Sequence, residues 1–260
     1  MAPLLLALSA PSAAARAYDL APRLAAGQVI AYDGTYLLAV PGAAAGKGIT
    51  LASIAYGLIF RVEAVDGQGA TVSAEFDRFE SRLRGVSTAA YTPLGKRLRF
   101  HLTPRGRLEE PEGDLWAPVW SGLLATWTGW PDRLLSVGET WDTTAETFVG
   151  PARAALSRTY RLCEVVDGEG GHALARLDYV ERGSIAASRA RLPDGEASLE
   201  GTVLGVGQAR LDLTLGRLMS AASVSTFTGE MRRPGAEAVA VRLETEITVG
   251  LRQTPAPGNP

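Results

Sequence analysis

The residues best placed by type and spacing to do chemistry are two pairs of acids. Asp77 and Glu80 recur as Asp178 and Glu181, within the similar stretches RVEAVDGQGATVSAEFDRFE and LCEVVDGEGGHALARLDYVE. Two carboxyl groups at a suitable separation are what glycoside hydrolysis requires. Acids on the polar face of a strand are usually solvated, so we expect that none of the four is catalytic.

The other reactive side chains are few and scattered. The chain has one cysteine and two histidines, too few for a structural zinc site. His101 and His172 are each expected on a solvated strand face, and Cys163 is expected to be buried and unreactive. No G-x-S-x-G elbow, G-x-x-x-x-G-K-[ST] loop or H-E-x-x-H pair occurs. The sequence therefore predicts no catalytic residue, no metal site and no cofactor, and we expect the protein not to be an enzyme.

Composition and charge narrow the class of partner. The chain has 260 residues, of which 46% are hydrophobic, enough for one large all-β domain or two smaller ones with a sizeable core. Its formal net charge is -2, which gives no basic footprint for nucleic acid. No apolar run approaches the roughly 20 residues that a membrane-spanning helix needs, so no integral membrane segment is expected.

The first residues, MAPLLLALSAPSAAARA, are typical of a secretory signal peptide over residues 1–17. An apolar core from Leu4 to Leu8 precedes a run of small residues with several cleavage points. No Lys or Arg precedes this core, which leaves the true start codon open, and an Ala-rich disordered leader is the alternative. No cysteine follows the core for lipidation, so we expect a periplasmic or secreted protein without a lipid anchor.

Alternation of apolar and polar residues dominates the rest of the chain. It is clearest in AVAVRLETEITVGL (residues 238–251) and QARLDLTL (residues 208–215), and it is typical of half-buried antiparallel strands. Phe60, Val62 and Ala64 are predicted to share one face with Val72, Ala74 and Phe76 across a hairpin. The predicted fold is therefore all-β: a large antiparallel curled sheet or half-barrel.

Turn signals divide these strands. Turns are predicted at the four Asp-Gly dipeptides, which are Asp33-Gly34, Asp66-Gly67, Asp167-Gly168 and Asp194-Gly195. The glycine-rich GTVLGVG (residues 201–207) does not precede a helix, so we expect a flexible hairpin connection there and not a phosphate loop.

The similar stretches that carry the acids predict an internal duplication. The match extends outward, because LAAGQVIAYD resembles LSVGETWDTT and FHLTPRGRL resembles LDLTLGRLMS. We expect a first β half over residues 18–110 and a second over residues 134–251. In both copies the apolar parity slips near Arg78 and Tyr179, which we interpret as a β-bulge; the alternative is that the outer face is covered there.

Residues 111–133, between the halves, break the strand pattern and predict a helical connector. Its apolar residues have the spacing of one helix face, with Asp114 as the N-cap. The predicted ligand-binding residues all lie on that face: Trp116, Trp120, Leu123, Leu124 and Trp127. The tail over residues 252–260 is rich in Pro, Gly and Asn and is expected to be disordered.

The order of LAAGQVIAYD, the Asp-Gly hairpin, HLTPRGRL, WPDRLLSVGETWDTT and LTLGRLMS resembles a known group of proteins. These are uncharacterised exported bacterial β-proteins and lipoproteins that carry a domain of unknown function, and the resemblance spans residues 24–251. It implies no catalytic residues, and the chain departs from the lipoprotein members by lacking the lipidated cysteine. In architecture alone, the predicted fold resembles the half-barrel carriers of bacterial lipoproteins.

Two functions of different classes follow. A binding protein that holds an apolar or lipid-like ligand between sheet and helix predicts a cavity bordered by Trp116, Trp120 and Trp127. A cell-envelope structural or protein-interaction module predicts a filled core with an exposed apolar patch or a free strand edge. The expected partner is accordingly a lipid or an envelope protein.

Overall fold

The computed structural model describes residues 16–42, 48–83, 86–87, 93–109, 130–149, 152–192 and 195–252. Within these ranges the chain is almost entirely strand, which confirms the predicted all-β class. The strands are β1 (Ala17–Tyr18), β2 (Val29–Val40), β3 (Ile49–Asp66), β4 (Gly69–Leu83), β5 (Val86–Ser87), β6 (Arg97–Leu102), β7 (Leu135–Ser136), β8 (Thr140–Val149), β9 (Ala152–Asp167), β10 (Ala173–Leu192), β11 (Gly195–Asp212), β12 (Arg217–Arg232) and β13 (Val239–Leu251). A short 3₁₀ turn, η1 (Glu169–Gly171), connects β9 to β10.

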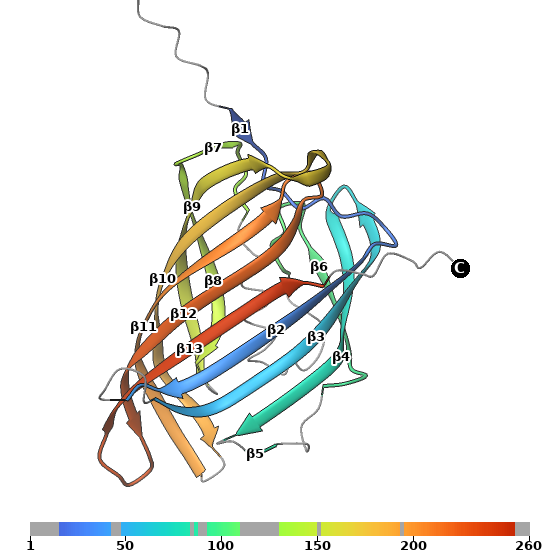
Figure 1. Cartoon of the computed structure of the whole chain (residues 1–260). Helices are drawn as coiled ribbons and strands as arrows, with labels where there is room; N and C mark the ends of the chain where they lie inside the picture. Colours follow the sequence, from blue (N-terminus) through green and yellow to red (C-terminus); the bar gives the residue numbers. More distant parts are fainter. Residues whose placement is uncertain are drawn as a thin grey trace, which may run out of the picture.

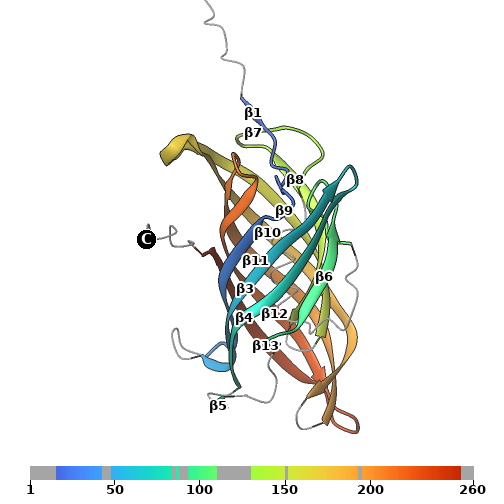
Figure 2. The same cartoon turned by 90° about the vertical axis from the view of Figure 1, so that its right-hand side faces the viewer.

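One antiparallel sheet contains all of these strands except β1 and β7, which pair with each other. Its order is β5-β4-β3-β2-β13-β12-β11-β10-β9-β8, and β6 also pairs with β4. The sheet curls strongly, as two perpendicular views show (Figures 1 and 2). In the described part of the chain no pairing joins β6 to β8, so the sheet is curled but not closed.

The core lies on the inner face of the curl. Phe60, Val62, Val72, Ala74 and Phe76 are all buried there, which confirms the predicted hairpin face. Aromatic rings meet edge to face across the strands. The pairs are Tyr56 with Phe76 at 6.0 Å and Phe60 with Phe100 at 6.2 Å between ring centroids. Ala64 is exposed, contrary to prediction, because the pairing shifts by one residue between Val62 and Ala64.

The two predicted bulges have different outcomes. In β4, Phe76 pairs with Leu58 and Arg78 with Gly57, so Asp77 is an extra residue and the bulge near Arg78 is confirmed. In β10, the pairing with β11 runs without interruption through Tyr179 and beyond, so the bulge predicted there is wrong. Tyr179 and Glu181 both keep the inward direction.

The turns predicted at the Asp-Gly dipeptides also have different outcomes in the structure. Asp66 closes the β3–β4 turn, where its Oδ1 accepts hydrogen bonds from the backbone N–H groups of Gln68 at 2.7 Å and Gly69 at 3.1 Å. Gly168 lies in the loop between β9 and β10, as predicted. β10 pairs with β11 up to Leu192 and Gly195, as a hairpin requires, although Asp194 lies outside the described residues.

Two glycine predictions are wrong. Asp33-Gly34 lies inside β2, where a Cβ on Gly34 would be 2.3 Å from the ring of Tyr56. Residues 201–207 are a continuous part of β11 and not a hairpin connection. In both strands the glycines leave space for a large side chain of the neighbouring strand.

The glycines that precede β2 and β8 make equivalent hydrogen bonds. The N–H of Gly27 donates to the carbonyl of Val62 at 2.8 Å, and that of Gly138 donates to the carbonyl of Leu162 at 2.7 Å. The duplication itself stays a prediction. The expected signal peptide (residues 1–17), helical connector (residues 111–133) and tail (residues 252–260) lie outside the described residues over 1–15, 111–129 and 253–260. Ala17, the last residue of the expected signal peptide, lies in β1, and the described residues 130–133 of the connector form no helix. Among the residues described, no helix is long and apolar enough to cross a membrane.

Candidate functional site

A row of polar residues crosses the inner face of the six strands from β8 to β13. Successive members lie directly opposite one another in the strand register. We call this row the polar belt; its residues are Thr143, Arg158, Glu181, Gly205, Ser225 and Thr245. The rows on either side are apolar: Leu156, Val203, Phe227 and Leu243 on one side, and Leu162, Leu177, Ala209, Ala221 and Val249 beyond the next row on the other.

An ion pair lies in this belt. Arg158 Nε donates to Glu181 Oε2 at 2.9 Å, and both side chains are only 4% exposed. The other carboxylate oxygen of Glu181 accepts a short hydrogen bond from the hydroxyl of Ser225. Gly205, between them in the register, makes this contact possible, because a Cβ there would be 2.6 Å from Glu181 Oε1 and 2.7 Å from Ser225 Oγ.

An aromatic row borders the belt on the side of β8–β10. Trp141 stacks on Tyr160 with centroids 5.0 Å apart, and Tyr160 lies 4.9 Å from Tyr179. The guanidinium carbon of Arg158 lies 5.3 Å from the centre of the Tyr179 ring, within the range of a cation–π interaction. We call Trp141, Tyr160 and Tyr179 the aromatic row.

Burial and neighbouring charges shift the pKa values of Tyr160, Tyr179 and Arg158. Burial raises the pKa of Tyr179 to about 12, although the charge of Arg158 opposes the shift. Burial likewise raises the pKa of Tyr160. For Arg158, burial lowers the pKa, but Tyr160, Glu181 and Tyr179 together raise it above its ordinary value. The guanidinium is therefore charged at every physiological pH.

Two hydroxyl oxygens at the site are buried and poorly satisfied. Thr143 Oγ1 has no hydrogen-bond partner in the described part of the chain. Tyr179 lies over Gly207 and toward Ser223, but its hydroxyl makes no hydrogen bond of ordinary geometry to a described residue. Such groups are few in folded proteins, and each can accept or donate to a polar group brought into the site.

A buried ion pair of this kind contributes little to stability compared with apolar residues of similar volume. The belt interrupts a surface that is otherwise apolar on both sides. Its arrangement can bind a polar group while the neighbouring rows contact apolar carbon.

The structure separates the acids that the sequence pairs. Glu181 lies on the inner face, whereas Asp178 lies on the outer face and bonds Arg176 at 3.0 Å. The expectation of a solvated Glu181 is therefore wrong, because cross-strand partners replace its water. Glu80 is exposed on the outer face.

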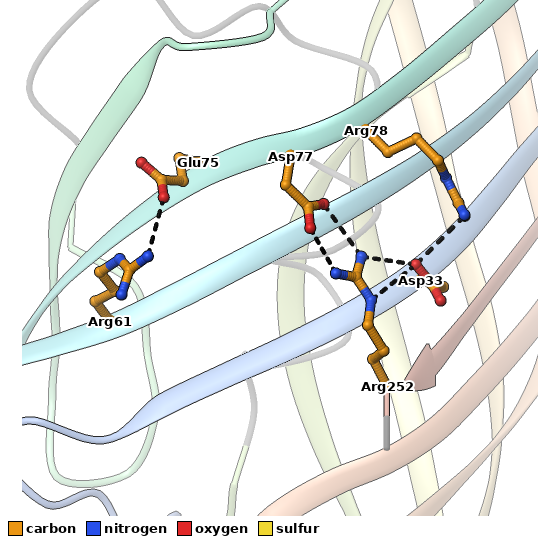
Figure 3. Close-up of polar contacts among 6 residues, drawn as sticks. All are labelled: Asp33, Arg61, Glu75, Asp77, Arg78 and Arg252. Carbon is orange, nitrogen blue, oxygen red and sulfur yellow. Dashed lines mark hydrogen bonds and ion pairs between the residues drawn. The ribbon is translucent and has the colours of Figure 1, made fainter. Parts of the chain in front are cut away.

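Asp77 is not freely solvated either. Figure 3 shows the cross-strand cluster in which Arg252 contacts both Asp77 and Asp33. Arg252 Nη1 donates to Asp77 Oδ2 at 2.5 Å, and Nη2 donates to Asp33 Oδ1 at 2.8 Å. Arg252, which the sequence assigns to the tail, thus connects the end of β13 to β2 and β4.

The histidines and the cysteine lie away from the belt. His172 Nδ1 lies 2.8 Å from Oδ2 of the buried Asp212, and His101 Nε2 lies 3.2 Å from the carbonyl of Gln68. Cys163 is half-buried at the bulge between β9 and β10, and burial raises the pKa of its thiol. Over the described ranges, no group of three or more His, Cys, Asp or Glu residues could hold a metal ion.

The predicted ligand-binding residues Trp116, Trp120, Leu123, Leu124 and Trp127 all lie outside the described residues. The belt residues were missed, although one signal was present. The apolar alternation along β10 places Glu181 on the inward face. From the sequence we interpret this as a sign of a bulge, whereas in the structure Glu181 is a buried acid.

A concavity lies on the outer face of β8–β13. It has a volume of ≈ 660 Å³, and Val180, Val206 and Val224 lie along it as direct neighbours in the register. These side chains are 43%, 60% and 49% exposed. We call this feature the valine groove.

No protein-family model and no curated protein matches the chain. A solved structure described as "lipid-protein interactions in lipovitellin" is similar, with a TM-score of 0.50 and 12% sequence identity. The match covers 92% of this chain and 26% of that one, so the chain spans about a quarter of its length. At this identity the likeness concerns the fold alone, which in this chain is a large curled β-sheet.

Proposed function

We propose that this protein is an exported, non-enzymatic binding protein that holds an apolar, lipid-like ligand against the inner face of its curled sheet. The observation that carries the proposal is the inner face of β8–β13, where apolar rows flank a buried polar belt that begins at β8, the last strand of the described sheet. Large curled sheets that bind apolar ligands combine an apolar lining with a few placed polar groups.

The position of the ligand under β8–β13 is part of the proposal, and the packing of the other half of the curl supports it. At the other side of the curl, a hollow lined by Leu24, Phe60 and Phe100 has a volume of only ≈ 10 Å³, too small for a ligand. In the described residues β8 pairs only with β9, so the polar belt begins at the edge of the sheet. The fold of the lipovitellin structure, described in terms of lipid–protein interactions, supports this choice of ligand.

Tryptophan fluorescence tests the proposal, because Trp141 stacks on Tyr160 next to the belt. Titration with a fatty acyl probe is expected to change the emission saturably at micromolar concentration. Trp141→Phe is the matched control: it should lose part of the change while native mass spectrometry still detects the bound probe. Absence of any saturable response across chemically varied amphiphiles, with no lipid co-purifying from the source cells, would contradict the proposal.

A second candidate is a protein-interaction module of the cell envelope, and the valine groove favours it. Exposed neighbouring valines on a sheet face are typical of a contact surface. Native mass spectrometry after mild extraction separates the two: a bound polypeptide that is lost in Val206→Ser supports this candidate, whereas bound lipid retained in Val206→Ser supports the first.

Export is part of the same proposal. Fractionation of the source cells is expected to recover the chain, shortened near residue 17, outside the cytoplasm. Full-length protein in the cytoplasmic fraction would contradict it.

A further inference from the structure

We infer that the valine groove is a self-association surface, through which two copies of this chain pack face to face about a twofold axis. This assignment rests on the groove of the second candidate function and names its partner as a second copy. The lipid-like ligand plays no part in the contact, since its proposed site is on the opposite face of the sheet. The observation is an exposed apolar row with a cation at one end and an anion at the other.

The middle of the groove is apolar on a face that is ordinarily polar. Antiparallel sheets with one packed face commonly present polar side chains to water on the other. Here Val180, Val206 and Val224 lie side by side on β10, β11 and β12. Leu204, 59% exposed, extends the row along β11. These side chains form one patch, and its contact with water is relieved when a second apolar surface covers it.

The ends of the groove carry opposite charges. Arg161 lines it on β9, and Glu246 lines it on β13. Both residues are exposed, and within the described ranges neither has an ion-pair partner. Asp178 lies opposite Arg161 in the register, but its carboxylate is bonded by Arg176 at 3.0 Å. The groove therefore offers a partner one cation and one anion, with the apolar row between them.

The order of the strands makes this arrangement complementary to itself. β9 and β13 lie two strands from β11, on opposite sides of it (Figure 1). A twofold axis that runs along β11, between two stacked outer faces, places β9 of one copy over β13 of the other.

The register brings the charges within reach of each other. Glu246 shares its cross-strand row with Thr159, and Arg161 is the next residue of β9 on the same face. Stacked sheets lie about 10 Å apart, a gap that an Arg and a Glu side chain span together. Arg161 of each copy can therefore pair with Glu246 of the other, and both pairs form at once by symmetry.

These charges favour a second copy over other occupants. A lipid surface or an uncharged ligand would cover the valines but leave Arg161 and Glu246 without counter-charges at the border of the contact. A different polypeptide would need an anion and a cation at the same spacing across an apolar row. A second copy of this chain presents that set, and the two opposed pairs fix its orientation.

Sedimentation velocity of the full chain at increasing concentration tests the association. We expect a reversible equilibrium of monomer and dimer with a dissociation constant in the micromolar range, as for a small interface. Val206→Asp, which places a charge at the centre of the row, should raise this constant at least about tenfold. The matched control is Val65→Asp, because Val65 is 44% exposed on β3 and does not line the groove. A wild type that stays monomeric at about 0.5 mM overturns the inference.

Charge reversal identifies the second copy directly. Arg161→Glu alone and Glu246→Arg alone each bring like charges together, so each variant should weaken its own dimer at least about tenfold. An equimolar mixture of the two should associate as tightly as the wild type, because both pairs then have opposite charges. Glu230→Arg, an exposed acid on β12 outside the groove, is the control and should leave the dimer unchanged. A mixture that does not associate, with both variants folded, overturns the inference.

Circular dichroism and titration with the acyl probe keep association separate from folding and from ligand binding. Val206→Asp should retain the wild-type spectrum and probe response, since the groove lies on the outer face. If Val206→Asp fails to fold, the mixture of charge variants decides. A monomer that retains a different polypeptide after mild extraction overturns the second copy as occupant and leaves the second candidate function standing.

Discussion

Arg158 and Glu181 form an ion pair at 2.9 Å on the inner face of the curled sheet, where each side chain is 4% exposed. They lie directly opposite each other on β9 and β10. Because water is excluded, each charge depends on the other, and the pair behaves as a unit.

Removing one member of the pair should therefore be much worse than removing both. Glu181→Ala is expected to lower the free energy of unfolding by about 3–5 kcal/mol, since it removes the carboxylate that faces the buried guanidinium of Arg158. Arg158→Met with Glu181→Met should change it by less than about 1 kcal/mol. Urea unfolding followed by circular dichroism measures both. Arg158→Met and Glu181→Met are also measured singly. If their two effects add up to the effect of the double variant, the charges do not interact.

Gly207 should be intolerant of a side chain. A Cβ at this position would lie 2.2 Å from Cζ of Tyr179, so Gly207→Ala must displace a ring of the aromatic row. We expect a loss of about 1–3 kcal/mol in unfolding free energy. Gly67→Ala is the control, because a Cβ there would meet nothing within 4 Å.

A double variant checks the cause of that loss. Combining Gly207→Ala with Tyr179→Ala removes the clash, so the double variant should be more stable than the sum of the two single effects predicts. Strict additivity would place the cause elsewhere in β11.

The Arg252 cluster predicts a dependence of stability on pH. Hydrogen bonding to Arg252 lowers the pKa of Asp77 below its ordinary value of 3.8, and the charge of Arg252 adds to this. A lowered folded-state pKa contributes stability above the unfolded value, and this contribution is lost as pH falls through the folded value.

Arg252→Ala should therefore destabilise the protein by about 1 kcal/mol at pH 7, a size typical of partly solvated pairs. The difference from wild type should shrink as pH falls below 3.8 toward the folded-state pKa. Thermal unfolding at pH 7 and at low pH tests this, with Arg182→Ala as an exposed control on β10. A difference that stays constant with pH would contradict a role for Asp77 ionisation.

Cys163 should react slowly with thiol reagents in the folded protein. Burial raises the pKa of its thiol above the ordinary value of 9.0, so little thiolate exists at pH 7. Labelling with a disulfide reagent is expected to accelerate strongly when the protein is unfolded in urea. Equally fast labelling of the native and unfolded protein would contradict this expectation.

The sequence by itself determined the all-β class, the inward face of the Phe60–Phe76 hairpin, the Asp66 turn and the bulge near Arg78. All of these depend on the period of side chains along a strand or on the preference of one turn, and both are properties of neighbouring residues. The exposure of Val180, Val206 and Val224 in the valine groove follows only from which face of the sheet curls inward.

Tertiary structure decided which residues the inward-facing and outward-facing side chains contact. The sequence around Glu181 does not predict its contacts with Arg158 and Ser225, because strand pairing brings these residues together from separate segments of the chain. Gly34 and residues 201–207 were assigned to turns for the same reason: their role is to leave space for side chains from other strands. Local propensity cannot distinguish a glycine that turns the chain from one that makes room for a ring, and only the register of the assembled sheet decides between them.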